Sequence, residues 1–229
     1  MVVEVQWPEV TLVVPVHRDS PETRRFLSDL SRVWPDYWSV VVVDNGSGAD
    51  FTPSLKPGFR LLVLPVNVGY GGAVRSALAS IQSRSVVWCP GNGKVSAEGL
   101  VSFTGRAVSA GALLVKAKRR GRLRRYAWKS FLAGLIHSFL LKINMFDSGG
   151  TPSLTQVNFL RQVCLGDDGP EFDAWIFFIA QRMGVTYTRV PVRYTDAGVG
   201  ESSWRRGFHS EIALLAKILQ FRNRRGGPV

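Results

Sequence analysis

The sequence predicts an α/β fold in which a mostly parallel central sheet carries helices on both faces. Short apolar segments alternate with segments of helical pattern through the first half of the chain, as in parallel sheets with helical connections. Several apolar segments end in polar or glycine-bearing loops, which is how an open α/β sheet forms a ligand site at the carboxyl ends of its strands. At 229 residues, the chain fits one such domain.

The first half supplies the predicted sheet and its first helices. Valine-rich runs at 10–16 and 40–43 are typical of strands buried on both faces. Ser20, followed by Pro21 and Glu22, predicts the start of a helix. The other predicted strands are 59–64, 85–89 and 112–116, and the other predicted helices are 71–81 and 96–109.

The second half has a different organisation. A basic run at 118–129 precedes an apolar segment at 131–146, which His137, Lys142 and Asn144 interrupt. Because of these interruptions we expect no membrane-spanning helix, but either a helix buried in the protein or one lying at a membrane surface. We also predict helices near 156–164 and 172–183, a strand at 186–192, a loop at 198–204, an amphipathic helix at 208–221 and a basic tail at 222–229.

Composition narrows the classes of partner. Lys and Arg number 29 against 17 Asp and Glu, giving a net charge of +12, which indicates a polyanionic partner: nucleic acid, an anionic membrane or phosphorylated substrates. No nucleic-acid recognition pattern accompanies the basic run, so we expect no nucleic-acid partner. Cys89 and Cys164 form neither a disulfide framework nor a zinc cluster and suit a reducing compartment. No secretory signal is visible at 1–8, and we expect a cytoplasmic protein.

Three loops carry candidate binding residues. Asp19 follows the first strand and Asp44 the second, where a carboxylate can accept hydrogen bonds from a base N–H or ribose hydroxyls. A glycine-bearing turn at 67–73 runs into a helix, and its amides, with Arg75 one turn in, favour an anionic group. Asp44 and Asn45 are alternatively turn residues that bond their own backbone. The glycine spacing is not the Gly-x-Gly-x-x-Gly of nicotinamide enzymes.

Together these segments resemble the nucleotide-sugar domain of family 2 glycosyltransferases, which have the GT-A fold, and especially the polyprenyl-phosphate (dolichyl-phosphate mannose synthase-like) sugar synthases. The resemblance spans roughly 10–208. It implies one domain over 1–229, with a donor half at about 8–117 and an acceptor half at about 118–210. It also implies an inverting hexosyltransferase that uses a uridine or guanosine diphosphate sugar. The residues that it implies for the nucleotide sugar are Pro15, Asp19, Asp44, Asn67, Gly69, Gly71, Arg75 and Asn92.

The sequence departs from the family pattern after the fourth predicted strand. The chain has Pro90-Gly91-Asn92-Gly93-Lys94, where the family has an Asp-x-Asp pair or Pro-Gly-Asp-Gly-Gln. Mg²⁺ or Mn²⁺ on a diphosphate prefers anionic oxygen ligands, which Asn92 does not offer. Three outcomes stay open: a weak metal site at Asn92, catalysis in which Lys94 and arginines take over part of the metal's role, or loss of activity. The motif is alternatively a plain turn.

The resemblance further implies a polyprenyl phosphate acceptor and a peripheral protein at the cytoplasmic, anionic face of a membrane. In these synthases, basic residues bind the acceptor phosphate and an apolar helix follows against lipid. Arginine suits phosphate because its planar fork makes paired charge-assisted bonds. A phosphate is already ionised, so attack on the sugar needs no general base. The acceptor candidates are Lys118, Arg122, Arg124, Arg125, Arg193, Ser202 and Arg205.

The catalytic candidates are Lys94, Asp147 and Asp173. Asp147 matches the family's Asp-x-x-Gly loop, and Asp173 lies where the family often has an acidic residue at a helix start. These two are the base candidates if the acceptor is a hydroxyl. The family's late arginine falls at Ala197, and Arg193, Arg205 and Arg206 are near enough in sequence to substitute for it. Two alternatives share the fold: transfer to a glycan hydroxyl in cell-surface polysaccharide synthesis, and a non-catalytic nucleotide-sugar-binding protein that has lost the metal aspartate.

Overall fold

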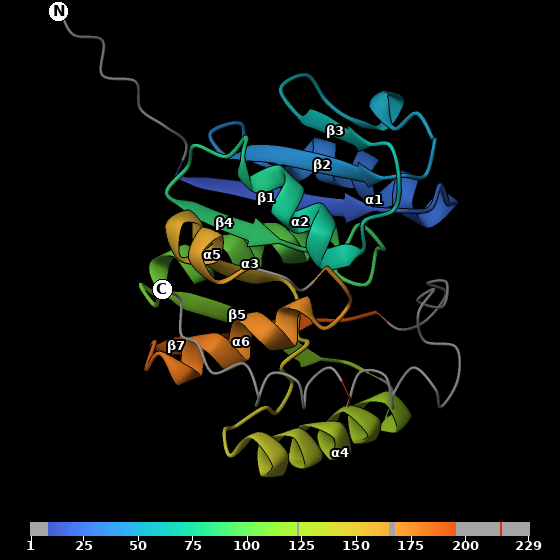
Figure 1. Ribbon diagram of the computed structural model, residues 1–229. Coiled ribbons are helices and arrows are strands. Elements are labelled where there is room, and N and C mark those ends of the chain that lie inside the picture. Colours follow the sequence, from blue (N-terminus) through green and yellow to red (C-terminus); the bar gives the residue numbers. More distant parts are fainter. Residues whose placement is uncertain (1–8, 123, 165–167, 196–215, 217–229) are drawn as a thin grey trace, which may run out of the picture.

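The computed structural model describes residues 9–122, 124–164, 168–195 and 216 (Figure 1). One seven-stranded sheet has the order β3-β2-β1-β4-β6-β5-β7. β6 is antiparallel to both of its neighbours, and the other neighbouring pairs are parallel. The predicted α/β class with a mostly parallel sheet is therefore confirmed.

Serine caps begin two of the helices, as their sequences suggest. The hydroxyl of Ser20 accepts a hydrogen bond from the amide of Thr23, and that of Ser96 accepts from Gly99. The strands are β1 (Val10–Val16), β2 (Ser39–Asn45), β3 (Arg60–Leu64), β4 (Ser85–Trp88), β5 (Leu114–Arg120), β6 (Ser153–Gln156) and β7 (Tyr187–Arg193). The α-helices are α1 (Pro21–Val33), α2 (Tyr70–Leu78), α3 (Ala97–Ser109), α4 (Arg124–Leu141), α5 (Val157–Val163) and α6 (Phe172–Arg182), and Thr52–Ser54 forms a 3-10 turn.

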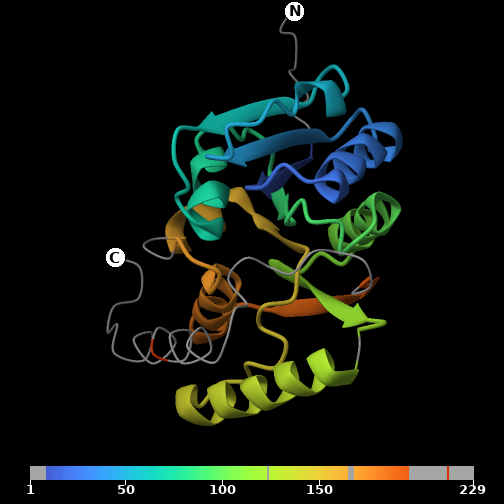
Figure 2. The same cartoon turned by 90° about the vertical axis from the view of Figure 1, so that its right-hand side faces the viewer.

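Two apolar cores lie on the two faces of the sheet, with α1 and α3 on one face and α2, α5 and α6 on the other (Figures 1 and 2). Neighbouring valines of one strand enter different cores: Val13 packs with α2 and α6, and Val14 packs with α1 and α3. Alternating side chains of a strand point to opposite faces, so a strand covered on both sides is apolar throughout. This explains the continuous valine runs.

The structure differs from the sequence prediction around β5 and β6. β5 continues to Arg120 instead of ending at 116, because its basic end pairs in parallel with β7, with Lys118 opposite Pro191 and Arg120 opposite Arg193. The first part of the basic run is therefore a strand. β6 was not predicted, since four residues are too few to show a period of two.

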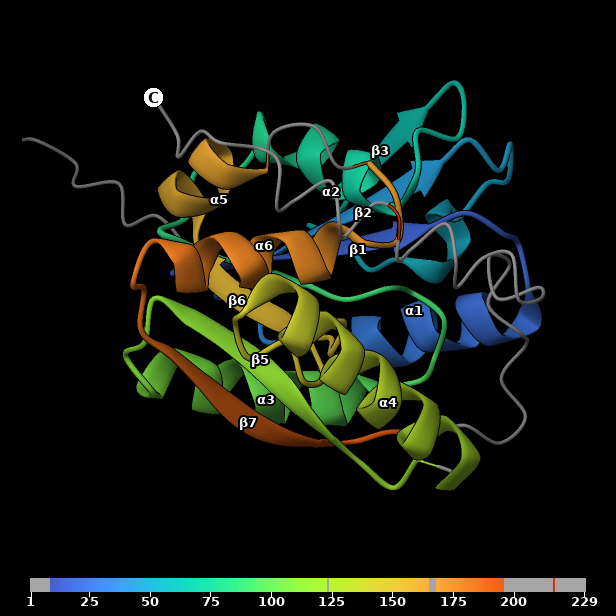
Figure 3. The ribbon, with the colours of Figure 1, turned by 60° about the horizontal axis from the view of Figure 1, so that its bottom comes forward.

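α4 begins at Arg124 and ends at Leu141, earlier at both ends than the predicted segment. It lies at the end of the molecule opposite β3, as Figures 1 and 2 show, and Figure 3 shows it in front of α6 and β5. The buried-helix interpretation is wrong for one face of α4. Its exposed large apolar residues are Trp128 (65%), Phe131 (49%), Leu132 (45%), Leu135 (48%), Ile136 (42%) and Phe139 (83%).

These six residues, which we call the α4 stripe, recur at helical spacing and so share one side of the helix. The opposite side faces the protein. A Cβ added to Gly134 would lie 2.9 Å from Cδ1 of Phe146, so a glycine lets this loop approach the helix. Within the described residues, no helix combines the length and apolarity that crossing a membrane requires.

Candidate active site

The carboxyl ends of β1 and β2 meet the glycine-bearing turn that begins α2. The side-chain amide of Asn45 donates to Oδ1 of Asn67 (2.9 Å) and to the carbonyl of Gly69 (3.0 Å), and its oxygen accepts from the amide of Val68 (2.9 Å). Nε2 of His17 lies 3.1 Å from Nδ2 of Asn67. The predicted convergence of the Asp44 loop with this turn is therefore observed, through the residue that follows Asp44.

Asp44 is fully buried and has one oxygen with a partner. Its Oδ1 accepts from the amide of Ser47 at 3.0 Å, so the turn interpretation holds for that oxygen. Its Oδ2 is buried and, in the described part of the chain, has no hydrogen-bond partner. A buried carboxylate oxygen without a donor is unfavourable. Asp44 therefore keeps one acceptor, and because the side chain has no exposed surface in this arrangement, a ligand N–H or hydroxyl reaches it only after neighbouring residues move.

Two other residues predicted to contact the nucleotide sugar are engaged within the protein. Asp19 accepts from Nε and Nη2 of Arg24 at 2.6 and 2.8 Å. Nη1 of Arg75 lies 2.6 Å from Oδ1 of Asp168, whose backbone carbonyl accepts from the amides of Gly71 and Gly72 at 2.9 and 3.3 Å. At the start of α2, the backbone carbonyl of Asp168 therefore accepts from the amides, and its carboxylate pairs with Arg75.

The same contact explains one of the glycines of this turn. Gly69 has φ of 81°, and a Cβ there would lie 2.1 Å from the carbonyl oxygen of Asp168. Gly69 is therefore required because the segment before α6 approaches this turn closely. Its presence does not by itself indicate a bound ligand.

The turn between β4 and α3 carries Asn92 and Lys94. The amide of Gly91 donates to the carbonyl of Pro15 at 3.0 Å, and the amide of Thr195 donates to the carbonyl of Lys94 at 2.9 Å. The turn is thus held between the end of β1 and the residues after β7. Oδ1 of Asn92 accepts from the amide of Lys94 at 3.2 Å.

These residues do not fit a divalent cation. Asn92 brings no charge, and its side-chain oxygen already accepts a hydrogen bond. In the ranges that the structure describes, no three His, Cys, Asp or Glu side chains come together to hold a metal ion.

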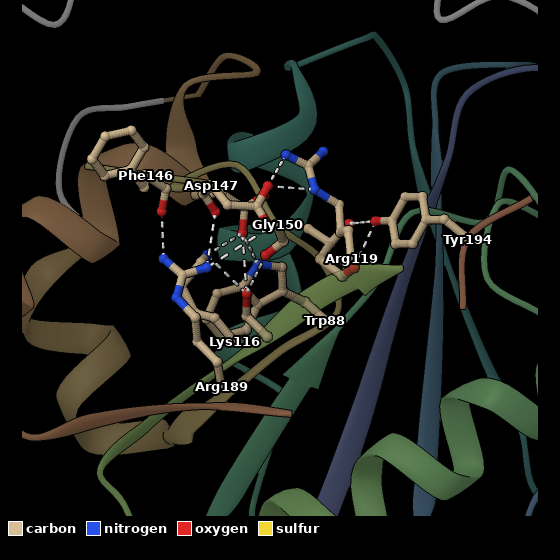
Figure 4. A network of polar contacts seen from close by, with 11 residues as sticks. Trp88, Lys116, Arg119, Phe146, Asp147, Gly150, Arg189 and Tyr194 are labelled. Carbon is tan, nitrogen blue, oxygen red and sulfur yellow. Dashed lines mark hydrogen bonds and ion pairs between the residues drawn. The ribbon is translucent and has the colours of Figure 1, made fainter. Parts of the chain in front are cut away.

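A network of charged residues joins β5 and β7 to the loop that follows α4 (Figure 4). Oδ1 of Asp147 accepts from Nε of Arg119 at 2.6 Å and also from its Nη2. Nη1 of Arg189 lies 3.8 Å from Oδ2 of Asp147 and donates to its carbonyl at 3.4 Å, while Nη2 donates to the carbonyl of Phe146. Protonating Asp147 would weaken both ion pairs, so its geometry suits the orientation of two arginines better than proton abstraction.

Beneath this network lies a fully buried ion pair. Oδ1 of Asp173 accepts from Nε1 of Trp88 at 2.9 Å and lies 3.5 Å from Nζ of Lys116, which donates to Oγ of Ser153 at 3.0 Å. Burial lowers the pKa of Lys116, and the carboxylate of Asp173 partly opposes this shift. Asp173 is 3% exposed, so in this arrangement it does not reach an acceptor hydroxyl.

Sequence reasoning missed Lys116, Arg119 and Arg189. Burial alone would lower the pKa of Arg119, but the carboxylate of Asp147 more than offsets it and the pKa is raised. Together with Asp147 and Asp173 they make three cations against two carboxylates, an excess of one positive charge. The sequence signal was the basic run itself, but only the pairing of Lys116 with Arg189 across β5 and β7 brings these cations together.

Comparison with known proteins places the fold. No protein-family model and no curated protein matches the chain. Glucosyl-3-phosphoglycerate synthase from Mycobacterium tuberculosis, bound to Mn²⁺, UDP and glucosyl-3-phosphoglycerate, matches with a TM-score of 0.74 and 16% identity over 94% of this chain and 80% of its own. The same enzyme with Mn²⁺, UDP-glucose and phosphoglyceric acid gives 0.74 and 15% over the same shares. A structure described as a mycobacterial protein gives 0.72 and 17% over 93% and 75%.

The chain has the GT-A fold. The narrower resemblance to family 2 and to polyprenyl-phosphate synthases stays a prediction.

The remaining acceptor candidates that the structure describes lie on β5, on β7 and near the start of α4. Lys118 and Arg193 are exposed on β5 and β7, and Arg124 is exposed at the start of α4. Nη1 of Arg122 donates to Oγ of Ser130 at 2.9 Å. Arg125 lies in α4 and its side chain is outside the description, while Ser202, Arg205 and the predicted elements at 198–229 lie outside the described residues.

Proposed function

We propose that this protein is a glycosyltransferase that moves a sugar from a nucleoside diphosphate sugar to a polyprenyl phosphate at a membrane face. Two observations support the donor. The fold is similar, over 94% of the chain, to that of a synthase structure that holds UDP-glucose. At the end of β2, Oδ2 of Asp44 also has no partner in the described part of the chain, and such an acceptor suits a base N–H or a ribose hydroxyl.

The charged network supports a phosphate-bearing acceptor. Arg119 and Arg189 converge on one carboxylate and leave an excess of positive charge that an anion would balance. A phosphate oxygen of the acceptor attacks the anomeric carbon, and the bond from that carbon to the donor diphosphate breaks with its electron pair leaving on the diphosphate. This single displacement inverts the configuration and needs no general base, which agrees with the engagement of Asp147 and Asp173.

The α4 stripe is the main observation that supports a lipid acceptor. Its six large apolar side chains are between 42% and 83% exposed, and burying one such side chain fully stabilises by about 1.5–3 kcal/mol. Lys118, Arg120 and Arg124 are exposed beside the start of α4, and each basic residue near an anionic leaflet adds about 1 kcal/mol. An anionic bilayer satisfies both features, and the protein would bind it peripherally on the cytoplasmic side.

A small phosphorylated acid is the second candidate acceptor. The similar synthase structures hold phosphoglyceric acid or glycerol 3-phosphate. The same two arginines would serve such a ligand, but the exposed α4 stripe has no role in that reaction. A glycan hydroxyl has less support, because the acidic side chains that would act as its base are held in ion pairs.

Donor binding is tested by a thermal-shift panel of uridine and guanosine diphosphate sugars, since a ligand that binds the native state raises its melting temperature. We expect at least one to raise it in the wild type and the increase to disappear in Asp44→Asn. Asp36→Asn, which removes the same charge at a side chain that is 94% exposed, is the matched control and should keep the increase. A panel without any shift in the wild type would contradict the proposed donor.

A further inference from the structure

The turn between β4 and α3 carries a lysine and no carboxylate, which bears on how this chain would balance the charge of a donor diphosphate. The similar synthase structures contain Mn²⁺ or Mg²⁺ together with UDP. We infer that this chain binds a nucleoside diphosphate without a divalent cation, and that Lys94 on the β4–α3 turn supplies positive charge to the diphosphate. The inference rests on the proposed function.

Three acidic side chains near the site are paired with arginines, whereas Asp44 keeps one carboxylate oxygen without a partner in the described part of the chain. Asp19 is held by Arg24, Asp147 by Arg119, and Asp168 by Arg75. Glu22, whose carbonyl lies 3.9 Å from a Cβ placed on Gly93, is in the first turn of α1, where hydrogen bonds from its own amide and from Ser20 lower the pKa of its carboxyl. A cation that needs several converging anionic oxygens would have to break these contacts.

The β4–α3 turn itself is fixed in place. A Cβ on Gly91 would lie 2.5 Å from Cγ1 of Val16, so the turn packs directly on the end of β1. Lys94 is held through its backbone at both sides, by its amide to Asn92 and by its carbonyl from Thr195. Moving the backbone of this turn to serve a metal would therefore disturb its contacts with β1 and with Thr195, which follows β7.

The charges of this turn favour a diphosphate and oppose a metal. An asparagine stands where the resembling family has an aspartate, which removes one negative charge, and the lysine two residues later adds a positive one. An ammonium in the same turn repels a divalent cation and attracts phosphate oxygens directly. Both differences make the turn more positive, as expected of a site in which a lysine replaces the charge of a metal ion.

Isothermal titration calorimetry with UDP and with GDP, in EDTA and in Mn²⁺, tests the inference. We expect at least one of the two nucleotides to bind, with a Kd that changes by less than about twofold between the two conditions. Binding that appears only with Mn²⁺ would overturn the inference and leave the proposed function standing. If neither nucleotide binds in either condition, the inference and the proposed donor both fail.

Two substitutions test whether Lys94 and Asn92 determine how the diphosphate is bound. Lys94→Met should weaken nucleotide binding by about tenfold, since it removes a charge-assisted contact to the diphosphate. Lys142→Met makes the same change at an exposed lysine and should have no effect. Asn92→Asp should weaken binding in EDTA, because a carboxylate then faces the diphosphate, and Mn²⁺ should restore it. An unchanged Kd in Lys94→Met, or an Asn92→Asp protein indifferent to Mn²⁺, would contradict the assigned residues.

Discussion

The two parts of the proposed site are built differently. We call the ends of β1 and β2 with the turn before α2 the donor edge, and the Asp147 network on β5 and β7 the acceptor edge. At the donor edge, polar side chains of His17, Asn45 and Asn67 contact one another, and Oδ2 of Asp44 has no partner among the described residues. At the acceptor edge, charged side chains from β5 and β7 surround Asp147 with an excess of positive charge. The donor edge is therefore held by hydrogen bonds, and among the described residues Oδ2 of Asp44 is an acceptor without a donor. The acceptor edge has one excess positive charge, which a bound anion would balance.

The difference also shows in how each edge meets solvent. Asp44 is fully buried, whereas the acceptor side carries the α4 stripe on its surface. The acceptor side exposes apolar and basic groups together, which is typical of a protein that works at an anionic membrane.

The largest effect that we expect concerns the buried pair under the acceptor edge. Lys116→Met or Asp173→Asn alone should lower the free energy of unfolding by about 3–5 kcal/mol, because each leaves a buried partner without its counterpart. The double variant should recover part of this loss. Urea denaturation of the four proteins measures the cycle, and additive losses would show that the two residues do not act as a pair.

The same lysine gives this part of the protein a pH dependence. The pKa of Lys116 is lowered in the folded state, so between that lowered pKa and the ordinary one the unfolded chain binds more protons than the folded protein. Stability should therefore rise with pH between the lowered folded value and the ordinary pKa of 10.5, and Lys116→Met should lose this rise. Identical slopes for the variant and the wild type would contradict the burial argument.

The next effect concerns the arginines. Arg119→Met should reduce transfer to the acceptor by about a hundredfold, because two charge-assisted bonds to an anion are worth about 3 kcal/mol. Binding of the nucleotide should not change. Arg119→Lys should recover part of the activity, and Arg32→Met, at a side chain that is 73% exposed, is the control. If nucleotide affinity fell in parallel with transfer, the division into two edges would be wrong.

A smaller effect concerns the membrane. Replacing both Trp128 and Phe139 by Glu should reduce pelleting with anionic vesicles by about tenfold, because the most exposed apolar surface of α4 is lost. Tyr37→Glu changes an aromatic side chain that is 70% exposed in the segment between α1 and β2, outside α4, and should leave pelleting unchanged. Equal pelleting of all three proteins would remove the membrane assignment.

The smallest effect concerns Arg75. Its ion pair with Asp168 joins two side chains that are 39% and 47% exposed, and such pairs contribute about 0–1 kcal/mol. Arg75→Met should therefore destabilise the protein slightly and change UDP affinity by less than about twofold. A large loss of UDP affinity in calorimetry would instead show that Arg75 contacts the diphosphate, as the sequence suggested.

The sequence predicts the donor half well because its signals are local. A valine run predicts β1, Ser20 predicts the start of α1, and a strand followed by Asp44 or by a glycine turn predicts where the edges meet. It does not predict the acceptor edge. Arg119 and Asp147 are 28 residues apart and Arg189 is 42 residues beyond Asp147, and nothing local shows that β5 pairs with β7.

The most direct test of the proposed reaction is a partition assay with a radiolabelled nucleoside diphosphate sugar, purified protein and anionic vesicles containing polyprenyl phosphate. We predict that label moves into the organic phase with the wild type and that this transfer is lost with Arg119→Met. Label that stays in the aqueous phase with polyprenyl phosphate but is transferred to a soluble phosphorylated acid, or is transferred to neither, would contradict the lipid acceptor.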